Sequence, residues 1–152
     1  MMTDTSALEP GEYLRRLFDD VEFSYLVVVA AQLGVADLLA SGARSIADLS
    51  AATGVDARSL YRVLRALASR GLFREDDDQR FSLTPLAEPL RRDAPQSIRP
   101  QALWSGSEAY RRTWGDLAYS VRTGEPAFDH VYGKPFFDSL PRIEHLRRSS
   151  TM

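Results

Sequence analysis

The sequence has 152 residues and a formal net charge of −2; 44% of its residues are hydrophobic and 26% are charged. This composition is typical of a globular protein and argues against disorder of the whole chain. The slightly acidic balance argues against a dedicated nucleic-acid-binding protein, whose domain is usually strongly basic. The sequence has no cysteine, so disulfides and thiolate chemistry are excluded. The N-terminus also has no basic and apolar signal pattern, and we therefore expect a cytoplasmic protein.

The first residues divide into a polar end and a helical stretch. Residues 1–10 are small or polar, and we expect them to form a flexible N-terminus. From Gly11 onward the apolar residues return at helical spacing, which predicts a helix with one apolar face. That face carries Leu14, Leu17, Phe18 and Val21.

From Phe23 to Leu33 the segment is apolar on nearly every side. A helix that is hydrophobic all round must also be buried all round. Two hypotheses account for this pattern: a central helix of the chain's own core, or a helix shared with a partner subunit. We favour the second hypothesis, which predicts a homodimer. The interface candidates are Leu14, Phe18, Phe23, Leu26 and Val27.

Residues 45–71 carry the clearest local signals. Ser45 precedes Asp48 in a near capping-box arrangement, which predicts the start of a helix. Gly54 is expected to end that helix in a left-handed conformation. Asp56 then caps a second amphipathic helix, and Gly71 lies just past its end. A further short helix is expected before this region, from Gly34 to Leu39.

Two short strands are predicted next, at Leu72–Glu75 and Arg80–Leu83, joined by the polar tip DDDQ. Helix, turn, helix and β-hairpin in this order form a winged helix. Thr84 and Pro85 favour the start of another helix, because proline suits the first helical position.

The remaining residues are rich in aromatic side chains. Pro95 and Pro100 predict a connector, and Ala102–Thr123 is expected to be one helix closed by Gly124. The tail, residues 141–152, has a pattern that starts a helix, and we interpret it as a truncated linker helix or tail.

The sequence offers no visible catalytic, metal-binding or cofactor-binding residues. His130 and His145 do not have the spacing of a metal pair. Asp76, Asp77 and Asp78 lie at the predicted hairpin tip, where solvated charge is the default interpretation. No two glycines are separated by a single residue, whereas a nucleotide-binding turn needs closely spaced glycines.

A DNA-binding transcriptional regulator is the alternative function. Winged helices place their second helix in the major groove, and here that helix carries Arg58, Arg62 and Arg65. The acidic hairpin tip and the negative net charge weigh against this alternative, because phosphate neutralisation dominates DNA affinity.

Two runs of residues resemble a known family. The run VAAQLGVADLLASGARSIADLSAATGVDARSLYRVLRALASRGLFRE is similar to the N-terminal dimerisation domain, a winged helix, of S-adenosylmethionine-dependent small-molecule O-methyltransferases. The run WGDLAYSVRTGEPAFDHVYGKPFFDSL matches the segment that precedes the catalytic domain of that family. Together the resemblance covers roughly residues 12–140.

The resemblance implies a mainly α-helical fold, with residues 11–100 as a dimerisation domain containing a winged helix. It implies that residues 101–140 form an aromatic-rich helical region leading toward a separate or missing catalytic domain. In the family that domain binds S-adenosylmethionine, and the substrates are phenolic or polyketide-type aromatics. Trp114, Phe128 and Tyr132 have two interpretations: they pack the last helices, or they form a wall of the substrate pocket.

Overall fold

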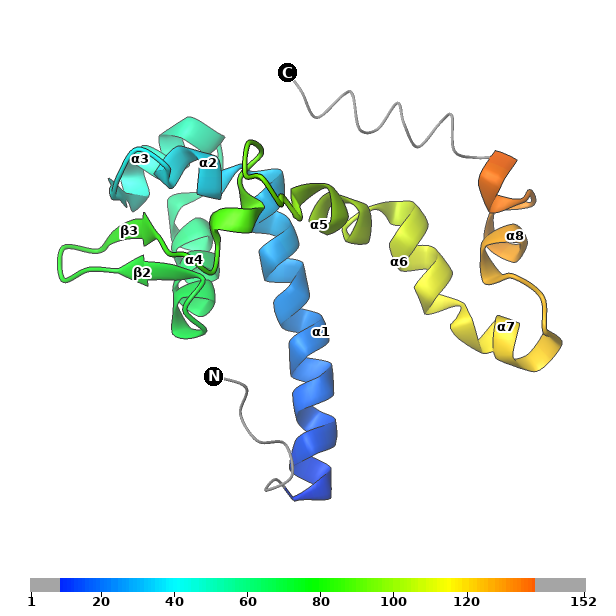
Figure 1. Cartoon of the computed structure of the whole chain (residues 1–152). Helices are drawn as coiled ribbons and strands as arrows, with labels where there is room; N and C mark the ends of the chain where they lie inside the picture. Colours follow the sequence, from blue (N-terminus) through cyan, green and yellow to red (C-terminus); the bar gives the residue numbers. More distant parts are fainter. Residues whose placement is uncertain (1–8, 139–152) are drawn as a thin grey trace. The chain divides into compact units, whose positions relative to one another are not determined.

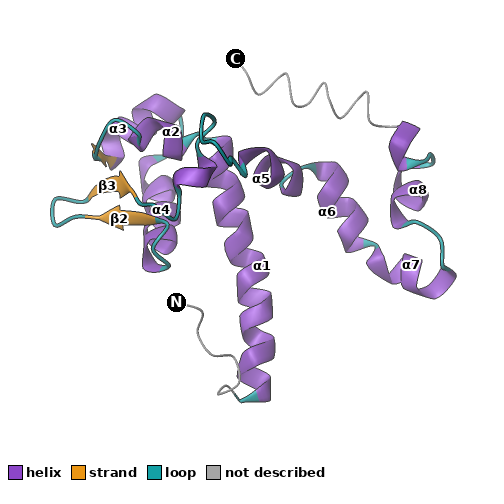
Figure 2. Cartoon of the chain, in the orientation of Figure 1, coloured by secondary structure: helices purple, strands orange, loops and turns teal. Residues whose placement is uncertain are grey.

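The computed structural model describes residues 9–138, and this part of the chain divides between Trp104 and Ser105 into two compact units. Helices dominate both units, and the strands belong to the first (Figure 2). The predicted mainly α-helical fold with a small β-hairpin is therefore confirmed. Among the described residues, no helix combines the length and the apolar character that crossing a membrane would require.

The first unit begins with the long helix α1, Pro10–Gln32. Its first position is a proline, whose fixed backbone angle suits a helix start and whose missing N–H is not needed there. The amphipathic and all-apolar segments of the sequence thus form one continuous helix. Gly34, at φ 65°, then turns the chain into the short helix α2, Val35–Leu39. A left-handed angle of this kind carries little cost in glycine because there is no Cβ to clash.

The winged helix follows as predicted. Helix α3, Ile46–Thr53, is capped by Ser45, whose hydroxyl accepts a hydrogen bond from the backbone N–H of Asp48 at 3.1 Å. Gly54 ends α3 at φ 70°. Helix α4, Ala57–Ser69, is capped by the Asp56 carboxylate, which accepts from the Ser59 N–H at 2.8 Å. These caps depend on residues a few positions apart, which is why the sequence alone could identify them.

The sheet has three antiparallel strands in the order β1-β3-β2. Strands β2, Phe73–Glu75, and β3, Arg80–Leu83, form the predicted hairpin. Strand β1, Arg44–Ser45, pairs with the other side of β3 and was not predicted. Two residues are too few to show an alternating pattern, and only the fold brings them beside β3.

One hydrophobic core joins α1, α2, α3, α4 and the sheet. Leu49, Leu64, Leu67, Phe73 and Phe81 are almost completely buried in it. The Tyr61 ring meets the Phe81 ring edge to face, with the centroids 6.0 Å apart. The winged helix is therefore packed onto the C-terminal part of α1 rather than standing as a separate domain.

The predicted helix at Thr84–Pro85 is wrong. The segment forms turns followed by one short 3-10 helix, Glu88–Leu90. The Thr84 hydroxyl lies 2.8 Å from the carbonyl oxygens of both Gly71 and Leu72, which ties the segment back to the start of β2. Pro89 also lacks the N–H that a continuing helix would use.

The predicted single helix over Ala102–Thr123 is also wrong. The chain forms α5, Arg99–Ser105; α6, Glu108–Gly115; and α7, Leu117–Thr123. Ser107 caps α6 by accepting from the Tyr110 N–H at 3.2 Å, and Asp116 separates α6 from α7. Gly124 ends α7 in the left-handed region, as predicted. Helix α8, Ala127–Tyr132, packs against α6 in the second unit.

Arg99 is a buried charged residue at the start of α5. Its Nε donates to the carbonyl oxygen of Ala31, near the C-terminus of α1, at 3.1 Å. Carbonyl groups at a helix C-terminus lack partners within the helix, so a cationic donor there is favourable. Arg99 therefore fastens α5 to the end of α1 within the first unit.

We expect Arg99→Met to lower the free energy of unfolding by about 1–3 kcal/mol, because a buried hydrogen bond from a charged donor is lost while the alkyl stem is retained. Urea unfolding followed by far-UV circular dichroism, at one protein concentration, measures the change. Arg92→Met, at an exposed side chain, is the control. Equal stability of Arg99→Met and the wild type would show that this bond does not hold α5 in place.

The Asp56 cap predicts a pH dependence. Hydrogen bonds from the Ser59 side chain and then from the Ser59 backbone N–H lower the pKa of Asp56 from its ordinary value of 3.8. The stability that the carboxylate contributes is therefore complete above pH 3.8 and is lost as the pH falls through the lowered value. Asp56→Asn keeps a capping oxygen but cannot titrate. We expect the variant to match the wild type in thermal stability at neutral pH and to lose less stability on acidification.

Candidate functional site

Helix α1 has two apolar faces, and one of them faces the chain's own core. Phe23, Leu26 and Val27 are partly buried against that core, and Ala30 and Ala31 are fully buried within it. Most of the apolar segment between Phe23 and Leu33 is therefore covered within the first unit.

Arg70, at the C-terminal end of α4, makes two contacts with α1 near this inner face. Arg70 pairs with Asp20, and its guanidinium lies over the Phe23 ring, 4.1 Å from the centroid. The ion pair is exposed and adds little by itself. The cation over the ring covers part of an apolar side chain that would otherwise meet water.

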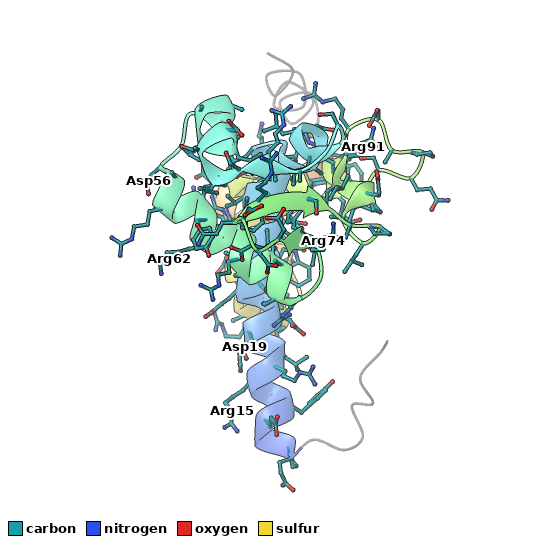
Figure 3. The ribbon with its side chains drawn as sticks, turned by 90° about the vertical axis from the view of Figure 1, so that its left-hand side faces the viewer. Arg15, Asp19, Asp56, Arg62, Arg74 and Arg91 are labelled. Atoms are coloured by element: carbon teal, nitrogen blue, oxygen red, sulfur yellow. The ribbon has the colours of Figure 1, made fainter. Side chains whose placement is uncertain are left out.

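The second face of α1 is not covered by the described residues of the first unit. Residues 9–22 are all exposed, and Figure 1 shows this half of α1 running past the other elements of the first unit. Figure 3 shows Arg15 and Asp19 projecting from the same half. Six large apolar side chains lie on the helix here, with exposed fractions from 40% for Tyr13 to 70% for Phe18. This group, the α1 stripe, consists of Tyr13, Leu14, Leu17, Phe18, Val21 and Tyr25.

The predicted interface residues fall on both faces. Leu14 and Phe18 belong to the α1 stripe, whereas Phe23, Leu26 and Val27 lie partly buried on the inner face. Val21 and Tyr25 were not among the interface candidates, although Val21 lies seven residues after Leu14 and Tyr25 lies seven residues after Phe18, a spacing that places them on the same side of the helix. The helical spacing in the sequence thus indicated the α1 stripe, but it could not show which face of the helix would be buried in the core.

The three aromatic pocket candidates of the second unit differ in burial: Phe128 is buried, Tyr132 is partly buried and Trp114 is exposed. Phe128 is 8% exposed, and its ring contacts Tyr132 and Phe136 at centroid distances of 4.7 and 5.1 Å. Trp114 is 57% exposed, and its ring contact is with Tyr110 at 5.8 Å. The structure brings Phe128 and Tyr132 together, and it leaves much of Trp114 on the surface of the unit.

His130 lies within the described residues, beside two other side chains of its unit. Its ring stacks on Tyr119, with the centroids 3.9 Å apart and the planes 12° apart. Its Nε2 lies 3.9 Å from the Asp116 carboxylate, which is too long for a hydrogen bond. The described residues contain no cluster of three or more histidine, aspartate, glutamate or cysteine side chains suited to a metal ion. His145 lies outside the described residues.

The described residues do not fit S-adenosylmethionine. The cofactor's usual cradle is a glycine-rich turn at the end of a strand in a doubly wound parallel sheet. The sheet in residues 9–138 is small and antiparallel, and a two-residue strand forms one edge of it. No step of methyl transfer can be derived from these residues.

The winged helix presents the arginines that raised the DNA-binding alternative. Arg58, Arg62 and Arg65 are exposed on α4, and Figure 3 shows Arg62 projecting from that helix. The hairpin tip keeps its acidic character: an Asp76 carboxylate oxygen accepts from the backbone N–H groups of Asp78 and Arg80, at 3.1 and 2.8 Å. The carboxylates of the tip would face the phosphate backbone in a docked complex.

Comparison with known proteins accounts for this fold. Residues 16–93 match the model of the O-methyltransferase dimerisation domain, and this match includes the whole winged helix. The chain is 46% identical over 114 residues to the phenazine O-methyltransferase PhzM of Lysobacter antibioticus, a match covering 75% of this chain and 33% of that protein. It is 39% identical over 126 residues to an 8-amino-8-demethylriboflavin N,N-dimethyltransferase of Streptomyces davaonensis, covering 83% of this chain and 36% of that protein.

Solved structures agree. The N,N-8-amino-8-demethyl-D-riboflavin dimethyltransferase RosA from Streptomyces davawensis superposes with a TM-score of 0.86 at 35% identity, over 94% of this chain and 43% of RosA. The chain spans about a third of the length of the curated relatives described here. The chain belongs to the O-methyltransferase dimerisation-domain family.

Proposed function

We propose that this chain is the homodimerisation module of a small-molecule methyltransferase. The α1 stripe carries the proposal, because it leaves six large apolar side chains exposed along one side of one helix. Single exposed apolar residues are ordinary, but a contiguous patch marks an interaction surface. In a member of a dimerisation-domain family, a second copy of the chain is the partner that fits this surface.

The stripe also has the character of a subunit interface. Tyr13, Phe18 and Tyr25 are aromatic, and aromatic side chains are enriched at interfaces. Leu14, Leu17 and Val21 continue the apolar surface between them. Such a surface becomes favourable when a partner removes it from water, at roughly 25 cal/mol per Å² of apolar area.

We further propose that the module works with a catalytic domain that binds S-adenosylmethionine and methylates a phenolic or polyketide-type aromatic molecule. The names of the relatives support the substrate class, since one acts on a phenazine and another on a riboflavin derivative. One of them is named for methylation of oxygen and the other for methylation of nitrogen. The similarity therefore supports a planar aromatic substrate more strongly than a particular acceptor atom.

Residues 11–100 would form the dimerisation domain in this scheme, and residues 101–140 the aromatic-rich approach to the catalytic domain. Phe128 and Tyr132 suit one wall of a pocket for a planar ligand, because aromatic faces offer large apolar area and offset stacking. Trp114 is available to a ligand or to a partner through its exposed ring. We expect the protein to act in the cytoplasm.

We expect Phe18→Glu to weaken the homodimer. A carboxylate placed within an apolar interface must lose water without gaining a partner. Loss of a central aromatic contact is typically worth at least about 2 kcal/mol, so the dissociation constant should rise by about 30-fold or more. Sedimentation equilibrium measures this constant. Leu86→Glu is the matched control, because Leu86 is an exposed apolar residue outside α1.

A wild-type chain that stays monomeric at micromolar concentration would contradict the proposed function. So would a Phe18→Glu variant that dimerises as tightly as the wild type. Circular dichroism of each variant shows whether the helices are retained.

We expect Phe128→Ala to lower the free energy of unfolding of the second unit by about 3–5 kcal/mol, because a buried ring is removed and a cavity is left. Phe137→Ala, in the same unit at a ring that is 77% exposed, is the matched control and should cost much less. Thermal unfolding monitored by near-UV circular dichroism measures both. Equal effects would mean that Phe128 is not a packing centre of the unit.

A further inference from the structure

The outer side of helix α4 carries a row of arginines. Arg58, Arg62 and Arg65 are exposed, and their spacing of four and three residues places them on one side of the helix. The opposite side holds the leucines of α4 that are buried in the core, Leu60, Leu64 and Leu67. The packing that holds α4 in the fold therefore also holds the row facing outward.

An open groove continues the row toward the sheet. It has a volume of about 550 Å³, and its lining includes Arg65 and Ser69 of α4 and Arg74 of β2. Arg74 is exposed, so it adds a further positive charge beyond the C-terminal end of the row. We call the four residues Arg58, Arg62, Arg65 and Arg74 the arginine surface.

The charge of the arginine surface is not balanced by its neighbours. An ordinary solvated helix face mixes charges of both signs, because like charges three or four residues apart repel each other. Helix α4 has three arginines and no carboxylate between Ala57 and Ser69. The groove is lined by two arginines and one carboxylate, that of Glu75, so it also keeps a net positive charge. None of the four arginines of the surface forms an ion pair within residues 9–138.

The length and the surroundings of the arginine surface narrow the choice of ligand. Arg58 and Arg65 are seven residues apart, which corresponds to about 10 Å along the helix axis. A single phosphate or carboxylate group is too small to contact both ends of such a row. A DNA duplex is long enough, but it would bring its phosphates near the carboxylates at the hairpin tip, Asp76, Asp77 and Asp78. An acidic polypeptide has the necessary length and need not extend to the tip.

We propose that the arginine surface is a docking site for an acidic helix of another protein. Carboxylates at positions i, i+4 and i+7 of a partner helix rise along its axis by the same steps as the arginines of the row. Arginine suits this contact, because its planar guanidinium binds a carboxylate through two parallel hydrogen bonds. A single exposed ion pair adds little, so the arginines act together and orient the partner. The inference does not depend on the proposed homodimer, because the α1 stripe takes no part in it.

Fluorescence anisotropy with labelled peptides tests this docking site. The probe is an alanine-based peptide of about 20 residues, which is long enough to form a helix in water. Its glutamates are placed at i, i+4 and i+7 on one side of that helix. A second peptide of the same composition has its glutamates distributed around the helix. Both peptides are titrated with the full chain at low ionic strength, where exposed charges are least screened.

We expect the one-sided peptide to bind at least about tenfold more tightly than the distributed peptide, and its affinity to fall as salt is added. Arg62→Glu should weaken this binding at least about tenfold, because the reversed charge lies at the centre of the row. Arg62→Gln, which keeps a long polar side chain without the charge, should act in the same direction and replaces Arg62→Glu if that variant does not fold. Arg111→Glu, at an exposed arginine of the second unit, is the matched control and should leave binding unchanged.

Three results would each overturn the docking site: no binding of the one-sided peptide, equal affinity for the two peptides, or equal effects of the Arg62 and Arg111 variants. A labelled DNA duplex that binds more tightly than the one-sided peptide would also overturn it, and would assign the surface to nucleic acid. Phe18→Glu should bind the peptide as tightly as the wild type. A wild-type chain that is monomeric in sedimentation equilibrium but binds the one-sided peptide contradicts the homodimer and leaves this docking site standing.

Discussion

Helix α1 carries apolar side chains on two different faces, and this constraint organises the first unit. Its inner face supplies Ala30 and Ala31 to the core that also holds α4 and the sheet. Its outer face, the α1 stripe, is too apolar to be a typical solvated surface. Burial of one apolar face holds the helix in the fold. The other apolar face stays exposed and is available for contact with a partner.

The join between α1 and the rest of the unit uses side chains far apart in the sequence. Arg99 reaches the carbonyl of Ala31, and Arg70 lies over Phe23 while pairing with Asp20. The backbone N–H of Arg92 donates to the carboxylate of Asp37 in α2 at 2.8 Å, which holds the neighbouring helix. The contacts of Arg99 and Arg70 hold the C-terminal half of α1 against the rest of the unit, and the N-terminal half extends beyond them.

The winged helix packs against the C-terminal half of α1. Leu60, Leu64 and Leu67 of α4 lie in the core, and Phe73 and Phe81 bring the hairpin onto the same core. The exposed arginines of α4 are what remains on the outer side of an amphipathic helix. The helix order that serves DNA binding elsewhere forms part of a dimerisation-domain fold here, because fold does not by itself determine function.

The sequence by itself determined the features that depend on neighbouring residues. The caps at Ser45 and Asp56, the left-handed ends at Gly54 and Gly124, and the strand Arg80–Leu83 are local. Each follows from hydrogen bonds or backbone angles within a few residues, or from a short alternating pattern. The two motif runs were likewise sufficient to indicate the family, which the family model confirms.

Only the tertiary structure decided what depends on distant neighbours. Strand β1 exists because β3 lies beside it. The two faces of α1 look alike in the sequence, since burial is a property of what lies opposite a side chain. The core covers Phe23 and leaves Phe18 in water, and no local pattern distinguishes those two residues.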